Sequence, residues 1–152
     1  MGRFRVVALQ VGDSLSWLPA LFARIALFFI FAPTGLGKLR HLPKVTSYFV
    51  ELGLPAPHFN AVLVGASEFV CGALLLIGLL ARYAAIPLII DMAVAIAVAK
   101  WKDVAGIGGF FALDELLYIA LLLFILVGGA GAISIDGWIG YKLPSSRRGV
   151  YR

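Results

Sequence analysis

Apolar residues fill four long stretches of this chain, and short polar segments separate them. The stretches cover about residues 15–38, 59–80, 82–101 and 111–131. An α-helix needs about 20 apolar residues to cross the hydrocarbon core of a bilayer, so each stretch predicts a transmembrane helix. Only Ala81 and Arg82 join the second stretch to the third, which predicts an antiparallel hairpin. The pattern therefore predicts an all-α membrane protein, a bundle of four transmembrane helices.

A shorter amphipathic segment between the first two stretches predicts a helix that lies in the membrane interface. Within residues 42–54, the apolar positions that recur at helical spacing are Val45, Tyr48, Phe49 and Leu52. The segment is too short to span a bilayer, but its apolar face suits the headgroup boundary. A loop in which this spacing is accidental is the alternative.

The composition agrees with a membrane location. Hydrophobic residues make up 62% of the chain, charged residues make up 14%, and the mean hydropathy is +1.00. The net charge of +5 does not predict nucleic-acid binding, because the basic residues stand at the ends of apolar stretches. There they act as topology signals and headgroup contacts. A single cysteine, Cys71, excludes an intramolecular disulfide and a two-cysteine redox relay within the chain.

The distribution of Lys and Arg predicts the orientation in the membrane. The side with seven carries Arg3, Arg5, Arg82, Lys142, Arg147, Arg148 and Arg152. The side with five carries Lys38, Arg40, Lys44, Lys100 and Lys102. This excess favours the cytoplasm for both termini. Residues 1–14 would form a cytoplasmic segment, residues 15–131 the transmembrane bundle, and residues 132–152 a basic C-terminal tail.

Arg24, Glu68 and Asp91 stand in the middle of three different apolar stretches. Ionisable residues inside a membrane are costly, and they mark either a functional site or a mutual pairing. Arg24 is seven residues past the interfacial anchor Trp17, and Glu68 and Asp91 are each nine residues past the start of their stretches, so we expect all three at similar depth. Gly65 and Gly72 flank Glu68 on one helix face and indicate a close helix contact. We expect both carboxylates to meet Arg24, either as a structural lock or as a catalytic polar pocket that exchanges protons with a bound headgroup.

A second group of polar residues opens the fourth stretch at the same end as the basic residues of the outer side. Asp114, Glu115 and Tyr118 would face Lys38 there, and these four are candidate ligand-binding residues. Acids in the first turn of a helix are also favoured by the helix dipole alone, and surface ion pairs are common, which leaves a purely structural role open. His41 and His58 flank the outer loop, but two histidines without further ligands specify no metal site.

Several short motifs, taken in their order and spacing, resemble the DoxX family of small four-helix membrane proteins. After Arg24 come Gly35-Leu-Gly-Lys38, Phe49-Val-Glu-Leu-Gly53-Leu-Pro55-Ala-Pro57, Glu68, Gly72-Ala-Leu-Leu-Leu-Ile-Gly78-Leu-Leu-Ala-Arg82 and Gly131-Ala-Ile-Ser134-Ile-Asp136. The resemblance covers about residues 20–137. It implies a multi-pass protein of a bacterial or archaeal inner membrane, in a group linked to thiosulfate:quinone oxidoreductase subunits and membrane-associated oxidoreductase complexes.

Together, the polar constellation and the resemblance lead us to expect an integral membrane subunit of a quinone-linked oxidoreductase system. In this interpretation a quinone is the candidate cofactor, held in an intramembrane polar pocket. One alternative is a non-catalytic scaffold whose basic residues 142–152 gather soluble redox enzymes. Another is a small proton-coupled transporter, which with four spans and no internal repeat would have to work as a homo-oligomer.

Overall fold

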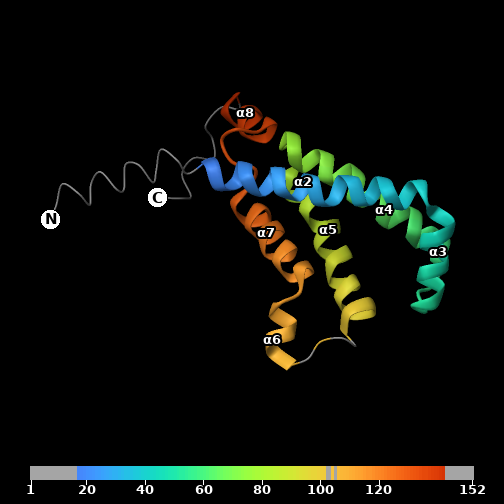
Figure 1. Ribbon diagram of the computed structural model, residues 1–152. Coiled ribbons are helices and arrows are strands. Elements are labelled where there is room, and N and C mark those ends of the chain that lie inside the picture. Colours follow the sequence, from blue (N-terminus) through green and yellow to red (C-terminus); the bar gives the residue numbers. More distant parts are fainter. Residues whose placement is uncertain (1–16, 102–103, 105, 143–152) are drawn as a thin grey trace.

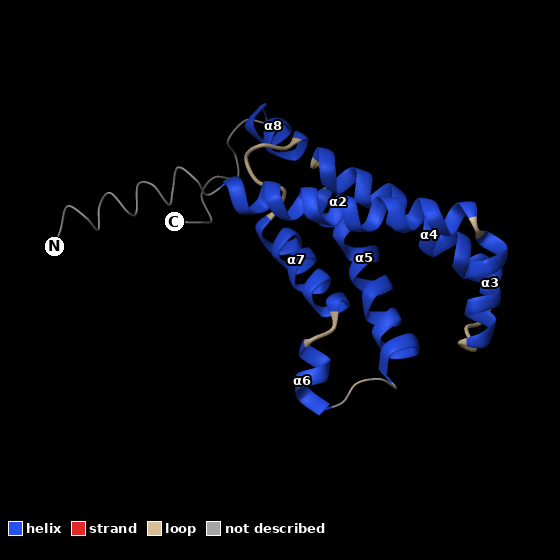
Figure 2. Cartoon of the chain, viewed as in Figure 1, coloured by secondary structure: helices blue, strands red, loops and turns tan. Residues whose placement is uncertain are grey.

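The computed structural model describes residues 17–101, 104 and 106–142, and within these residues the chain is helical and has no β-strand (Figure 2). The α-helices are α2 (Trp17–Arg40), α3 (Leu42–Glu51), α4 (Pro57–Ile77), α5 (Ala81–Ala95), α6 (Gly106–Phe111), α7 (Asp114–Gly128) and α8 (Ile135–Lys142). A π-helical turn, η1 (Ile96–Lys100), continues α5. The all-α prediction is confirmed.

Three of the predicted spans are present as helices long and apolar enough to cross a membrane. They are Trp17–Arg40, Pro57–Ile77 and the continuous stretch Ala81–Lys100, with mean hydropathies of 1.7, 1.9 and 1.8. The predicted fourth span, residues 111–131, is divided: α6 ends at Phe111, and α7 has 15 residues. At 1.5 Å per residue α7 is about 22 Å long, shorter than the ~30 Å hydrocarbon core. A fourth complete crossing is therefore not confirmed.

The helices form two antiparallel pairs that diverge from one end of the molecule (Figure 1). α2 packs along α4, and α5 packs along α7. α8 lies where the pairs meet, and α3 lies at the opposite end of α2 and α4. We call these the α8 end and the α3 end. Only a turn of three residues, from Gly78 to Leu80, joins α4 to α5, so the predicted tight hairpin is present.

Glycines allow α2 and α4 to pack with their backbones almost in contact. A Cβ atom on Gly35 would lie 2.5 Å from the backbone nitrogen of Phe69 and 2.7 Å from the carbonyl oxygen of Gly65. A Cβ on Gly72 would lie 3.0 Å from the backbone nitrogen of Ala32. Small residues at such crossings are the usual basis of helix packing in membranes. The close contact predicted from Gly65 and Gly72 is present, and its partner is α2.

Each of the helices α2, α4, α5 and α7 has one side that packs inside the protein and another side on which large apolar side chains are exposed. Leu27 and Phe31 of α2 are 0% and 1% exposed, whereas Phe22 and Phe29 on the same helix are 71% and 67% exposed. Large apolar side chains exposed over whole helix faces are unfavourable in water but suit a hydrocarbon solvent. The fold thus agrees with a membrane protein with several apolar helices.

The segments that connect the apolar stretches contain one helix that was predicted, α3, and one that was not, α6. The amphipathic segment does form a helix, α3, over Leu42–Glu51, although its position in a membrane interface stays a prediction. The connection between η1 and α7, where the hydropathy pattern predicted no separate helix, contains α6, Gly106–Phe111. The basic tail expected from residue 132 begins with α8, which packs at the α4–α5 turn. Residues 1–16 and 143–152, with their basic residues, lie outside the described part of the chain.

Candidate functional site

Lys38 and Glu68 form an ion pair between α2 and α4. Lys38 Nζ lies 2.7 Å from Glu68 Oε1, and the side chains of Lys38 and Glu68 are 30% and 3% exposed. The pair follows from helix direction, since side chains lean toward the N-terminus of their own helix. In these antiparallel helices the side chain of Lys38 points toward the α8 end, where α2 begins, and that of Glu68 points toward the α3 end, where α4 begins. The two side chains therefore converge, next to the close crossing at Gly35.

The second carboxylate oxygen of Glu68 is buried and unsatisfied. Glu68 Oε2 has no hydrogen-bond partner among the residues that the structure describes. A buried acceptor without a partner forfeits its hydration and costs about 1–3 kcal/mol, and more when it is charged. Such an atom in a folded protein needs an explanation, and a ligand that donates to it is one.

Asp91 of α5 lies on the other wall of the same region. Its Oδ2 atom is 2.7 Å from the hydroxyl oxygen of Ser67, which is also 3.0 Å from the carbonyl oxygen of Val64. A serine hydroxyl has one proton, so it donates to one of these acceptors at a time. Asp91 is close enough to Glu68 and Lys38 to interact with both electrostatically.

These three charged residues line a cavity of about 650 Å³, which we call the charged cavity. Its walls come from α2, α3, α4, α5, η1 and the first turn of α7, and they are mostly apolar. The side chains of α3 that line it include Tyr48 and Phe49, from the face predicted to meet lipid. Its lining residues on these two helices lie within residues 60–68 of α4 and residues 90–95 of α5. These are the parts of the two helices that lie apart from each other in Figure 1.

A second ion pair lies at the edge of the charged cavity. Lys100 Nζ is 3.8 Å from Glu115 Oε1, with the two side chains 49% and 17% exposed. Lys100 is the last residue of the π-helical turn η1. π-helical turns widen a helix locally and occur often at functional sites. The predicted cluster of Lys38, Asp114, Glu115 and Tyr118 is thus partly assembled, because Lys38 and Glu115 both line the charged cavity, together with Lys100.

Two members of that predicted cluster lie elsewhere. Tyr118 stacks edge-on against Phe31, with ring centroids 6.1 Å apart, and packs on the hydrophobic core. Asp114 is exposed at the start of α7 and does not line the charged cavity. His58 Nδ1 lies 3.4 Å from the hydroxyl oxygen of Thr46, and His41 precedes α3.

Arg24 does not meet either carboxylate, so that prediction is wrong. Arg24 is 2% exposed, and its guanidinium donates four hydrogen bonds of 2.7–2.8 Å, all to backbone carbonyl oxygens. The acceptors are Leu75, Leu76, Ala130 and Ile133. Arg24 leans toward the N-terminus of α2 and hence toward the α8 end, away from Glu68. There it binds the carbonyl oxygens of Leu75 and Leu76 in the last turn of α4, where carbonyl groups lack the usual N–H partner four residues on; the oxygen of Leu75 also accepts from the backbone N–H of Gly78 at 3.1 Å.

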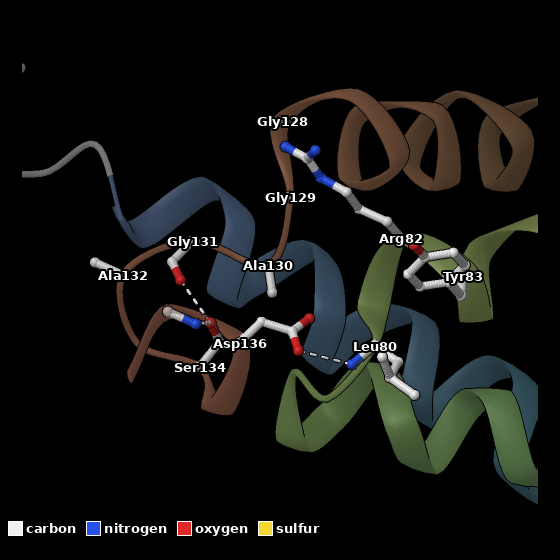
Figure 3. Close-up of a pocket in the computed structure, with 11 residues that line it drawn as sticks. Leu80, Arg82, Tyr83, Gly128, Gly129, Ala130, Gly131, Ala132, Ser134 and Asp136 are labelled. Carbon is white, nitrogen blue, oxygen red and sulfur yellow. Dashed lines mark hydrogen bonds between the residues drawn. The ribbon is translucent and has the colours of Figure 1, made fainter. Parts of the chain in front are cut away.

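Asp136 completes this junction from the other side. Its carboxylate accepts hydrogen bonds from the backbone N–H groups of Leu80 at 2.8 Å and Ala81 at 3.0 Å, so it caps the start of α5 (Figure 3). The backbone N–H of Asp136 donates to the carbonyl oxygen of Gly78. Sequence reasoning assigned Asp136 no role. The available signal was an acid two residues after Ser134, in a segment rich in turn residues.

A smaller cavity of about 500 Å³ adjoins this junction. Figure 3 shows Arg82 extending along Gly128 and Gly129, and Arg82 Nη2 donates to the carbonyl oxygen of Val127 at 3.1 Å. Ser134 Oγ donates to the carbonyl oxygen of Gly131 at 2.6 Å. The polar groups here serve mainly to tie the backbone turns together. The charged cavity is therefore the better candidate for a binding site.

The architecture defines a class: a multi-pass α-helical membrane protein with a charged cavity between its helices. The DoxX family model matches residues 20–101, and the chain belongs to this family. It is also similar to the uncharacterized membrane protein Rv3486 of Mycobacterium tuberculosis, with 35% identity over 124 residues, covering 74% of this chain and 76% of the relative. No solved structure matches the chain.

Proposed function

We propose that this protein is an integral membrane subunit of a quinone-linked oxidoreductase system and that it binds a lipid-soluble redox molecule in the charged cavity. The observation that carries the proposal is the buried, unsatisfied Oε2 atom of Glu68, a residue that lines a largely apolar cavity of about 650 Å³. Small-molecule sites usually have volumes of roughly 300–1,000 Å³, apolar walls and a few convergent polar groups. The charged cavity has each of these properties.

The chemistry of the walls suits a quinone. Its apolar tail would pack on side chains such as Leu63, Ile90 and Val94, which line the cavity and are exposed on its lipid side. Its ring oxygens take up or release protons when the ring is reduced or oxidised, and carboxylates and ammonium groups can exchange those protons. The resemblance to the DoxX family, which implies a link to quinone-dependent oxidoreductases, adds independent support.

The proposed site differs in composition from the one predicted from sequence. Lys38 joins Glu68 and Asp91 as the third charged group, and Arg24 becomes a structural residue of the helix junction. The remaining charged residues that line the cavity are Lys44, Lys100 and Glu115. They would connect the cavity with the membrane surface at the α3 end. With both termini in the cytoplasm of an inner-membrane protein, this end would face outward.

Extraction of the purified protein tests the proposal. The full chain is purified in mild detergent, its bound lipids are extracted, and quinones are quantified by liquid chromatography with mass spectrometry. We expect a quinone in near-stoichiometric amount, and at least tenfold less in Glu68→Gln. Glu51→Gln is the matched control, because Glu51 is an exposed residue of α3 that does not line the cavity. A protein that neither retains a quinone nor binds an added one would refute the proposed function.

A further inference from the structure

The hydrogen-bonding capacity of the charged cavity indicates which redox state of the ligand it takes. Resting on the proposed function, we propose that the site selects the reduced, hydroxyl-bearing form, a quinol, whose headgroup hydroxyl donates a hydrogen bond to Glu68 Oε2. The quinone form, which carries two carbonyl acceptors and no hydroxyl, would leave that atom unsatisfied.

The first step of the argument concerns Glu68 itself. Its ion pair with Lys38 uses the carboxylate form, and a carboxylate oxygen accepts hydrogen bonds but cannot donate them. Oε1 accepts from Lys38 Nζ, whereas Oε2 has no partner among the described residues. The vacant position on this buried group therefore calls for a donor.

The second step concerns the donors around the cavity. Each one either has an acceptor or is accessible to solvent. Ser67 donates to Asp91 or to Val64, and Asn60 donates to the carbonyl oxygen of Pro55 at 2.6 Å. The side chains of Lys38 and Lys100 are 30% and 49% exposed, so water or lipid headgroups can satisfy their remaining N–H groups. Among the described residues no buried side-chain donor lacks a hydrogen-bond partner, whereas one buried side-chain acceptor, Glu68 Oε2, does.

The third step concerns charge. Three lysines and three acids line the cavity, but Lys100 pairs with Glu115 and Lys44 is exposed on α3. Next to Glu68, the two carboxylates of Glu68 and Asp91 share one ammonium group, that of Lys38. The local excess of negative charge beside Glu68 attracts the positive end of an O–H dipole and repels the lone pairs of a carbonyl oxygen. Sites that must hydrogen-bond a ligand hydroxyl discriminate strongly against analogues without one, because a buried group is then left unpaired. The charge and the vacant acceptor thus favour the same redox state.

The preference for one redox state is tested by comparing the affinities of three ligands that have the same ring and tail. Full-length protein in lipid nanodiscs is titrated without oxygen, by calorimetry, with a decyl-substituted benzoquinone, the corresponding hydroquinone, and the dimethyl ether of that hydroquinone. The ether keeps the reduced ring but cannot donate. We expect the hydroquinone to bind at least tenfold more tightly than either of the other two. Equal affinity for all three would overturn the inference and leave the proposed function standing, whereas no binding of any of them would overturn both.

Glu68→Gln gives the experiment a second arm. The glutamine carbonyl would accept from Lys38, which places the amide NH₂, a donor, where Oε2 lies in the natural protein. We expect the preference to reverse, so that the quinone binds more tightly than the hydroquinone. Glu51→Gln should keep the natural order of affinities. If Glu68→Gln fails to fold, the comparison of the three ligands on the natural protein still decides the question.

Discussion

Lys38 of α2 and Glu68 of α4 are joined by an ion pair of 2.7 Å. Among the described residues, it is the only hydrogen bond or ion pair that the carboxylate of Glu68 makes. Removing the ammonium leaves a buried charge without its partner, which typically costs about 3–5 kcal/mol. We expect Lys38→Met to lower the thermal midpoint in detergent by more than the double variant Lys38→Met/Glu68→Leu does, since the latter removes both charges. Lys44→Met, an exposed lysine of α3, should change the midpoint little. Additive losses in the double variant would argue against a direct pair.

Gly35 and Gly37 provide a matched pair of substitutions on α2. Gly35→Ala would place a methyl group 2.5–2.7 Å from backbone atoms of α4, which cannot move without separating the helices. Overpacking of this kind costs about 1–3 kcal/mol, and it would also displace Lys38 from Glu68. Gly37→Ala has nothing within 4 Å of the new atom and should be neutral or stabilising. Chemical denaturation of both variants in detergent gives the comparison, and similar stabilities for the two would contradict the close crossing.

Arg24→Lys tests whether Arg24 acts through geometry or through charge. Lysine keeps the positive charge but lacks the planar guanidinium group. That group reaches four carbonyl oxygens, two on α4 and two in the segment after α7, and an ammonium group cannot donate to all four. We expect a loss of stability of about 2–4 kcal/mol, in line with other buried polar groups left unpaired. Arg82→Lys, which gives up one exposed hydrogen bond, should lose much less. Stability is measured by thermal unfolding. If Arg24→Lys unfolds at the same temperature as the natural protein, charge alone suffices and the geometric account is wrong.

The path of the chain through the membrane can be tested with single cysteines in a Cys71→Ala background. Ser47→Cys lies on α3, and Ala132→Cys is exposed near α8, at the opposite end of the molecule. We expect a membrane-impermeant maleimide to label the two positions from opposite sides. This result requires α7 to bring the chain back to the α8 end. Labelling of both from one side would contradict a helical arrangement in which α2 spans the bilayer.

The sequence predicted the helices well because length and hydropathy suffice for that task. Their ends differ by a few residues from prediction, as in α4, where Pro57 rather than Phe59 opens the helix. The fourth span was predicted too long because its apolar stretch includes Ala112 and Leu113, where the helix breaks. Hydropathy does not register such a break.

The site was predicted less completely because depth and spacing do not give side-chain direction. Arg24 and Glu68 were expected to meet, yet they lean apart because their helices are antiparallel. The same rule, applied to Lys38, could have identified its pairing with Glu68. The capping role of Asp136 depends on where the chain returns after α7, which periodicity within a segment cannot reveal.

Photolabelling with an azido-substituted quinone tests the central claim, that the charged cavity is the binding site, most directly. The labelled protein is digested and the adducts are mapped by mass spectrometry, with and without an excess of the unmodified ligand. We expect competable adducts on the cavity walls, at Tyr48, Ile90 or Val94, and their loss in Glu68→Gln. Adducts that the excess ligand does not displace, or that concentrate around Arg82 and Tyr83 at the other cavity, would contradict the claim.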